Sequence, residues 1–573
     1  MIHYRSVAAV LLLAVAGISI VSSVSGSKLV IGGGTTHDDF KQPGTQPNTI
    51  VDPVQPSANC SLCHGDYDIS VEPYGLWKSS MMAQAARDPL FHACLAIAEQ
   101  DAPFSGDLCI RCHSPGGWLE GNSTPSDGSA LNGKDFDGVN CHVCHRLVDP
   151  VFDINQNPFE DQAILASLAQ VPAEPHNGTY VIDPLDRRRG PYDLGRKFYW
   201  HEWRQSPFHQ ESQICGTCHD VSNPAFSRTG GPVPAASDIY ALNASNAEHP
   251  TQLKSDQFPL ERTFSEWSLS QFAIGPIEMG GRFGGNKSAV SSCQDCHMPD
   301  LSGEACKPGF SGVYRNDLPH HGFFGANTWV QRAIVMLDQT NDLYGPAEES
   351  GLTPAEAEDA IARNVDFLTK ASDMELTQTG GNLNVRIINQ TGHKLPTGYA
   401  EGRRMWINVK FFNVNNQLIE EKGFYNFARA QLRTVDTKVY EIHLGIDSAL
   451  SQTTGLPEGP SFHFALVNKI FKDNRIPPRG FTNAAFEAAQ AQPVGATYAD
   501  GQYWDDTLYT IPAGATKTTA TLFYQTTSKE YIEFLRSENV TNNAGRVAYK
   551  MWDLAGKSAP VEMDQVSIHL TPP

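Results

Sequence analysis

The sequence is poor in three features, and each scarcity limits what the protein can be. Positive charge is in deficit, with 43 Lys and Arg against 63 Asp and Glu, so the net charge is −20 with neutral histidines. Such a chain repels phosphate backbones and anionic bilayers, and we expect no nucleic-acid partner. No hydrophobic run after residue 21 reaches membrane-spanning length, so we expect no membrane insertion. No cysteine follows Cys306, which confines thiol chemistry to the first part of the chain.

Ten of the 12 cysteines fall in one pattern, Cys-x-x-Cys-His, that occurs five times. Composition alone predicts roughly 0.008 copies, so the pattern is not accidental; it is the attachment signature of c-type haem. In that signature, two thiols bind the porphyrin covalently and the histidine ligates the iron. The expected attachment residues are Cys60, Cys63, Cys109, Cys112, Cys141, Cys144, Cys215, Cys218, Cys293 and Cys296. The expected proximal ligands are His64, His113, His145, His219 and His297.

Two other uses of paired cysteines explain the pattern less well. A disulfide framework gives no reason for a histidine after every second cysteine. A closed zinc site usually combines two Cys-x-x-Cys knuckles, and five knuckles do not divide into such sites. We therefore expect five covalently attached haem c groups.

The amino-terminal residues have the pattern of a secretory signal peptide. Arg5 precedes an apolar run over residues 7–21, which is followed by small residues and a cleavage signal at Val24-Ser25-Gly26. The run is too short for a membrane span. We expect residues 1–26 to be removed and the protein to be exported, to the periplasm or to the extracellular cell surface.

The chain up to residue 372 divides into three further regions. Residues 27–58 are rich in Gly, Thr and Pro, and we expect a flexible tether. Residues 59–325 contain all five motifs with little periodicity, as expected of a mainly α or irregular domain packed around haem. Residues 326–372 favour a helical connector, with one helix ending near Leu337 and another opened by the capping box Thr353-Pro-Ala-Glu356.

The last region, residues 373–573, has the period-two alternation of half-buried strands. Three such runs lie at 383–387, 405–411 and 519–523, and one helix is expected at 528–536. Gly-, Pro- and Asn-rich breaks separate the runs, so we expect a β-sandwich accessory domain. The predicted fold class is therefore α+β and multidomain, with a haem-packed domain, a short helical segment and a C-terminal β-sandwich.

The second axial ligand decides what each haem can do. Histidine gives a six-coordinate carrier, methionine raises the potential, and a vacant position admits substrate. His209, in Trp203-x-x-Ser206-x-x-His209 shortly before Cys215, is the strongest candidate. A similar but incomplete pattern, Trp77-x-x-Ser80-Met81-Met82, places Met82 or Met81 near the position that His209 occupies in its motif. The alternative for that methionine is packing on a porphyrin face.

Four other histidines are candidates for the second ligand. On a Gly-rich loop, His321 is preferred over its neighbour His320. His393 lies between predicted strands in Thr391-Gly-His-Lys-Leu-Pro-Thr-Gly398, where it either ligates a haem or packs at the domain interface. For His176 and His201, the sequence favours iron ligation and an ordinary structural role equally.

Two cysteines, Cys94 and Cys306, lie outside the motifs. In an oxidising compartment, an even leftover pair indicates a disulfide. Ligation of an iron by a free thiol is the alternative.

The chain resembles multihaem c-type cytochromes with cytochrome c-554-like domains. The resemblance covers most of the mature chain and rests on the haem motifs, the His209 motif, Cys296-His297-Met298-Pro299 and His321-Gly-Phe-Phe-Gly325. The carboxy-terminal region resembles an accessory β-domain found with such cytochromes, through His393-Lys-Leu-Pro-Thr-Gly398 and Tyr524-Gln-Thr-Thr-Ser-Lys-Glu-Tyr531. The resemblance implies haem and electron transfer, but it does not imply a particular substrate.

Three functions remain open from the sequence. The first is an electron carrier with redox proteins as partners, which predicts that every haem is six-coordinate. The second is an oxidoreductase acting on a small nitrogen or sulfur oxyanion at one open haem. The third is a subunit of a haem-bearing filament or surface complex. All five motifs end in histidine, which favours the carrier over the enzyme, and the oligomeric state is left undetermined.

Overall fold

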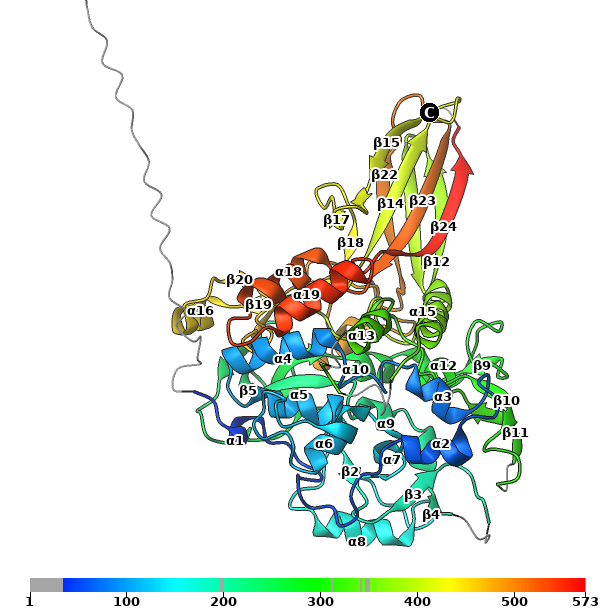
Figure 1. Ribbon diagram of the computed structural model, residues 1–573. Helices are drawn as coiled ribbons and strands as arrows, with labels where there is room; N and C mark the ends of the chain where they lie inside the picture. The colour runs from blue at the N-terminus through cyan, green and yellow to red at the C-terminus, as the bar shows by residue number, and fades with distance from the viewer. Residues whose placement is uncertain (1–33, 196–199, 311–312, 341–342, 346–350, 572–573) are drawn as a thin grey trace, which may run out of the picture.

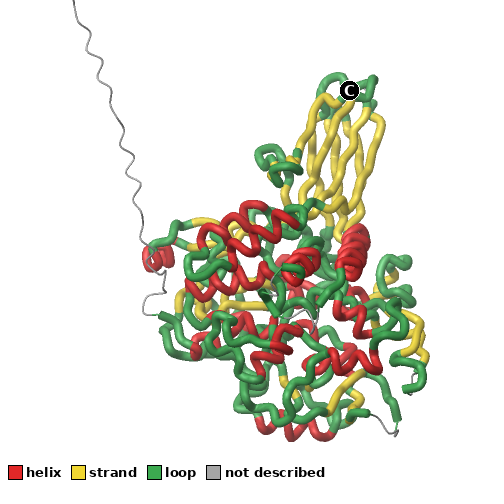
Figure 2. The backbone as a smooth tube through the Cα atoms, viewed as in Figure 1, coloured by secondary structure: helices red, strands yellow, loops and turns green. Residues whose placement is uncertain are grey.

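The structure, a computed structural model, describes residues 34–195, 200–310, 313–340, 343–345 and 351–571. A loop-rich body carries a projection of long strands, with the carboxy terminus at the tip (Figures 1 and 2). The expected signal peptide lies outside the described residues. Within the described part, no helix is both long and apolar enough to cross a bilayer. The mixture of helices and strands agrees with the predicted α+β class.

Each of the five motifs lies on or directly after a short helix. These helices are α2 (Ala58–His64), α5 (Ser105–His113), α7 (Cys141–Cys144), α9 (Gln213–Gly216) and α12 (Cys293–His297). One turn of helix brings residues i, i+3 and i+4 to one face. Each motif therefore presents two thiols and one imidazole from a single turn of chain.

Short elements connect these helices in the body. The other helices here are α3 (Pro73–Lys78), α4 (Pro89–Asp101), α6 (Pro115–Leu119), α8 (Phe159–Ser167), α10 (Thr263–Ser268) and α11 (Gln271–Ile274). The paired strands are β1 (Leu147–Val148) with β2 (Val181–Ile182), β3 (Arg187–Gly190) with β4 (Glu202–Gln205), β8 (Ile277–Glu278) with β9 (Ala289–Val290), and β10 (Asp300–Glu304) with β11 (Tyr314–Pro319). A three-stranded sheet joins β6 (Ile239–Leu242), β5 (Val221–Thr229) and β7 (Gln257–Glu261).

Residues 34–58 pack on the body, which differs from the flexible tether that we expected. Helix α1 (His37–Phe40) buries Phe40 in an apolar cluster with Phe226. Further along, the Thr45 N–H donates to the Tyr180 carbonyl oxygen, and Val54 is buried. A high content of Gly and Pro indicates irregular backbone, but it does not prevent that backbone from being buried.

The predicted connector contains α13 (Val330–Asp338) and α15 (Pro354–Thr369). The capping box of α15 is confirmed, because Thr353 and Glu356 each accept a hydrogen bond from the other's backbone N–H. At α13, Asn327 Oδ1 accepts the N–H groups of Trp329 and Val330. Helix α13 ends at Asp338, close to the predicted Leu337, and the side chain of Asn327 satisfies two N–H groups at its start.

Two antiparallel sheets form the projection. The first joins β12 (Ser372–Thr379), β13 (Asn382–Asn389) and β22 (Trp504–Thr510). The second joins β15 (Leu418–Lys422), β14 (Arg404–Phe412), β23 (Lys517–Gln525) and β24 (Val561–His569), with β18 (Val439–Tyr440) also paired to β14. The three predicted strands correspond to β13, β14 and β23. Their alternate apolar residues, such as Val385, Ile407 and Leu522, meet in one cluster.

The carboxy-terminal region does not stay within the projection. Helix α18 (Lys529–Glu538) was predicted, and the side chain of Ser528 caps it. Helix α19 (Ala544–Leu554) was not predicted, and both helices lie over α4 (Figure 1). The smaller elements of this region are β16 (Tyr425–Asn426), β17 (Gln431–Leu432), β19 (Ile442–Ile446), α16 (Ser448–Thr454), β20 (Gly459–Pro460), β21 (Lys469–Asp473) and α17 (Asn483–Ala488). One apolar cluster combines Ile97 of α4, Ile334 of α13 and Ile532 of α18, so the two halves of the chain share a core.

Candidate haem site

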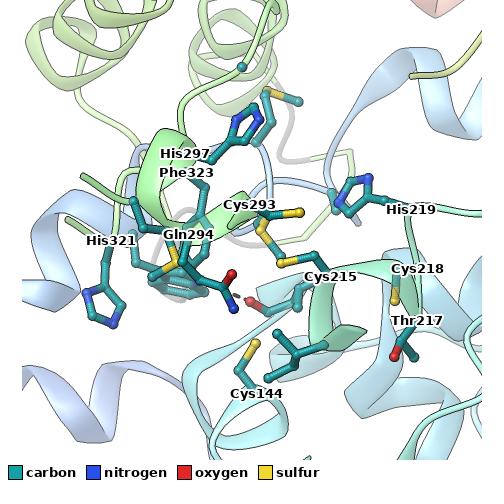
Figure 3. Close-up of a pocket in the computed structure, with 18 of the residues that line it drawn as sticks. Cys144, Cys215, Thr217, Cys218, His219, Cys293, Gln294, His297, His321 and Phe323 are labelled. Atoms are coloured by element: carbon teal, nitrogen blue, oxygen red, sulfur yellow. Dashed lines mark hydrogen bonds between the residues drawn. The ribbon is translucent and has the colours of Figure 1, made fainter. Parts of the chain in front are cut away.

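All five motifs line one cavity of about 1600 Å³. Each of the ten motif cysteines and five motif histidines contributes to its wall. Residues far apart in sequence meet there: Figure 3 shows His219, His297 and His321 around the sulfur atoms of Cys215 and Cys293. The wall is mainly apolar, as suits a large flat macrocycle.

Cysteines of different motifs lie next to each other. The thiols of Cys60 and Cys141 lie close enough for each to shift the pKa of the other, as do those of Cys112 and Cys218, and those of Cys215 and Cys293. Every cysteine is free of disulfide bonds. These contacts make the first motif a neighbour of the third, the second a neighbour of the fourth, and the fourth a neighbour of the fifth.

Four of the five motif histidines share one orientation. Their Nδ1 atoms lie next to backbone carbonyl oxygens: His64 at 3.1 Å from Ala305, His113 at 3.3 Å from Ala85, His145 at 2.6 Å from Arg189, and His297 at 2.5 Å from Phe324. A histidine that donates from Nδ1 keeps Nε2 free to bind a metal. His219 differs, since its Nδ1 lies 3.7 Å from the carboxylate of Glu261.

Burial keeps most of these imidazoles neutral, which is the form that ligates a metal. It lowers the pKa of His64, His113 and His297 to about 4 in each case. At His219, burial acts in the same direction, but the neighbouring Glu261 carboxylate outweighs it and the pKa is raised.

His393 faces a motif histidine across the cavity. Its ring centroid lies 6.3 Å from that of His297. Its Nδ1 lies 3.0 Å from the Lys394 carbonyl oxygen, which leaves Nε2 available. Two metal–imidazole bonds of about 2 Å, each with about 1 Å from nitrogen to ring centre, span roughly 6 Å. The spacing fits two axial ligands of one iron.

His145 has two such neighbours. Its ring centroid lies 5.9 Å from that of His209 and 6.5 Å from that of His321. His321 Nδ1 lies 2.8 Å from the Pro319 carbonyl oxygen, which leaves its Nε2 available. His209 is turned the other way: its Nε2 lies 3.1 Å from the Cys144 carbonyl oxygen, and its Nδ1 is buried with no hydrogen-bond partner among the described residues. The structure therefore brings the two strongest sequence candidates to one proximal histidine.

The other candidate ligands divide between the cavity and its surroundings. Met82 and His201 line the cavity. His176 is not among its lining residues, although its buried Nε2 has no hydrogen-bond partner among the described residues. His320 is also outside the lining, and its Nδ1 accepts the Gly322 N–H.

A buried ion network, which sequence reasoning missed, fixes the loop that carries His393. Lys394 Nζ lies 2.7 Å from Asp473, and Arg475 pairs with both Asp473 at 2.6 Å and Glu266 at 3.1 Å. Glu266 also accepts the Lys394 N–H. Because Glu266 belongs to α10 and the other three residues follow the connector, the network joins the two halves of the chain beside the cavity.

The expected Cys94–Cys306 disulfide is wrong. Cys94 Sγ lies 2.9 Å from Tyr531 Oη, on the side of the cavity next to α4. Cys306 lies beside the first motif, and its thiol donates to the Phe310 carbonyl oxygen at 3.3 Å. Counting leftover cysteines shows how many there are, but it gives no information on their distance in the fold.

Taken together, the free thiols, the neutral imidazoles with free Nε2 atoms and the facing histidine pairs fit covalently attached haem. No protein-family model matches the chain, and no curated protein matches it. A solved structure, described as a penta-heme cytochrome c552 from Thermochromatium tepidum, matches at 16% identity and a TM-score of 0.48, covering 91% of this chain and 100% of that chain. The likeness is distant, and the residue assignments rest on the geometry given above.

Proposed function

We propose that the protein is an exported pentahaem c-type cytochrome that carries electrons along closely packed haems in a respiratory or extracellular pathway. One observation carries this proposal: the residues of all five motifs line a single cavity, and thiols of different motifs lie close enough to shift each other's pKa. A protein that used each haem separately would not need one shared cavity.

The residues of this chain have distinct roles in that function. The ten motif cysteines hold the haems, and the motif histidines bind the irons from one side. His393 serves as the second ligand at the fifth motif, and His209 or His321 at the third. When bound, haem supplies reversible one-electron chemistry, while the surrounding apolar wall excludes water and so tunes the potentials.

The cysteine contacts support an order for the haems. The first and third motifs form one end, since Cys60 contacts Cys141. Cys144 of the third motif lies close enough to Cys215 to affect its pKa electrostatically, which connects the third motif to the fourth. The fourth also contacts the second and the fifth. Electrons that enter at the first haem would therefore pass through the third to the fourth, and only then reach the second or the fifth.

Haem counting tests the proposal directly. Pyridine haemochrome analysis and intact mass should give five haems per chain, and a spectroelectrochemical titration should fit five one-electron steps. Exchange should be rapid with a redox partner protein whose docking surface is basic, since this chain carries a net charge of −20. Fewer than five covalent haems, or haems that a partner cannot reduce, would refute the proposal.

A further inference from the structure

The five motifs differ in how far the residues between their two cysteines are buried. In the second, third and fourth motifs these residues are buried: Ile110, Arg111, His142, Val143, Gly216 and Thr217. In the fifth they are partly buried, and Gln294 Nε2 donates to the Glu211 carbonyl oxygen. In the first motif, Leu62 is 65% exposed. Helix α2, which carries this motif, therefore has a face that nothing in the described chain covers.

Strands β10 and β11 pack against α2 and extend that face (Figure 1). The Lys307 N–H donates to the Cys63 carbonyl oxygen at 2.7 Å. Tyr67 Oη donates to the Glu304 carbonyl oxygen at 2.8 Å, and Glu304 is paired in register with Tyr314 of β11. The first motif and the two strands thus form one continuous surface.

Large apolar side chains are exposed on this surface. Ile69 is 60% exposed and Tyr314 is 62% exposed, and neither lines the cavity, so both face the solvent outside the protein. Leu62 and Trp200 also line the cavity, and Trp200 is 76% exposed, with its ring 6.2 Å from that of Phe310. We call Leu62, Ile69, Trp200 and Tyr314 the docking face, because exposed apolar patches mark sites of interaction.

The charge around the docking face is acidic. Residues 58–70 and 300–319 contain five acidic residues and two basic ones. One of the two basic residues, Arg315, lies 3.7 Å from Asp317. Asp66 and Asp68 are exposed and have no ion-pair partner among the described residues. An apolar centre with a charged rim is the usual anatomy of a protein interface, and this rim calls for a basic partner.

We propose that the docking face binds a small redox protein with a basic surface around its cofactor, and that electrons enter or leave at the haem of the first motif. This inference rests on the proposed function. The first motif is one end of the order of haems, so an electron passed there has the whole array beyond it. The second motif is also an end, but Ile110 and Arg111 are buried. A second copy of this chain would bring the same acidic rim, which would repel it.

Stopped-flow electron exchange with a small basic c-type cytochrome tests the acidic rim. Asp66→Lys combined with Asp68→Lys should slow exchange about tenfold at about 10 mM salt, and less than about twofold at about 0.5 M salt, because salt screens the attraction. The matched control combines Glu375→Lys and Glu562→Lys, which change the net charge equally but lie on β12 and β24 of the projection. The control should slow exchange by less than about twofold.

Calorimetric titration with the same basic cytochrome tests the apolar centre. Tyr314→Ala should weaken binding about tenfold, as is typical when an aromatic side chain at the centre of an interface is truncated. Phe427→Ala is the control, because Phe427 is 60% exposed and follows β16, away from the first motif. Its affinity for the cytochrome should equal that of the parent.

Three results would overturn the docking face. The parent would bind no basic cytochrome, the two charge-reversal pairs would slow exchange equally, or analytical ultracentrifugation would find a dimer that Tyr314→Ala dissociates. The last result would assign the face to a second copy of the chain. Reduction by a small viologen separates these results from failure of the proposed function, since a viologen needs no docking face. Five haems that the viologen reduces leave the carrier intact, whereas fewer haems, or haems that it cannot reduce, refute the carrier itself.

Discussion

Replacing Lys394 by methionine tests whether the buried ion network holds His393 opposite His297. Lys394 is fully buried, and its ammonium group lies 2.7 Å from Asp473. Removing one partner of a buried ion pair costs about 3–5 kcal/mol, and the low end applies here because Arg475 still pairs with Asp473. With an unfolding entropy of about 2.1 cal/mol/K per residue, 1 kcal/mol is worth roughly 1 °C in a chain of this length. The unfolding midpoint should therefore fall by about 3 °C.

Differential scanning calorimetry measures this change, and electron paramagnetic resonance reports its effect on the site. Because Lys394 follows His393 directly, the loosened loop should also raise the high-spin ferric signal, since the proposed ligand His393 would no longer be held opposite His297. Lys410→Met is the control, since Lys410 is 42% exposed and lies 3.7 Å from Glu421, so its removal should change stability by less than about 0.5 kcal/mol. A midpoint within 1 °C of the parent, together with an unchanged spin state, would refute the role of the network.

Three further predictions concern His393, the motif cysteines and Glu401. His393→Ala should convert one low-spin haem to high spin without changing the haem count, and an unchanged spectrum would exclude His393 as a ligand. Cys296→Ala removes one thioether bond, so intact-mass spectrometry should find less protein that carries five haems. Cys306→Ala lies outside the motifs and should bind as many haems as the parent does. Burial raises the pKa of Glu401 from 4.5 to about 8, so the native state holds a proton that the unfolded chain releases. Stability should therefore fall as the pH rises from about 4.5 to about 8, and Glu401→Gln should flatten that part of the calorimetric pH profile; an identical slope would contradict the assignment.

Local patterns predicted local structure well. The alternation over residues 383–387, 405–411 and 519–523 predicted three strands, and the Thr353 capping box predicted the start of α15. In the third strand the predicted face carries Thr519, Thr521 and Phe523, whereas Ala520, Leu522 and Tyr524 enter the apolar cluster. Strand alternation and helix caps depend on residues a few positions apart, so the spacing of residue types along the chain is enough to predict them. Helix α19 was missed although its apolar residues recur with helical period.

Packing between segments that are distant in the sequence could not be predicted in this way. Residues 34–58 pack on the body, and α18 and α19 lie on α4 from the other half of the chain. Their apolar residues show that a partner surface exists, but spacing along the chain does not identify that surface. For the same reason the Cys94–Cys306 pairing was wrong, and Tyr531 as the partner of Cys94 could not have been found.

The sequence by itself determined the ten motif cysteines and the five motif histidines, because each motif acts within a single helical turn. It also narrowed the second ligands to a short set of histidines and methionines. Only the tertiary structure decided which of these face a motif histidine, since His393 meets His297, and His209 and His321 meet His145, through contacts between distant segments. The same physical reason applies to the order of the motifs: covalent spacing sets which side chains one turn of chain presents, whereas folding sets which side chains lie opposite them.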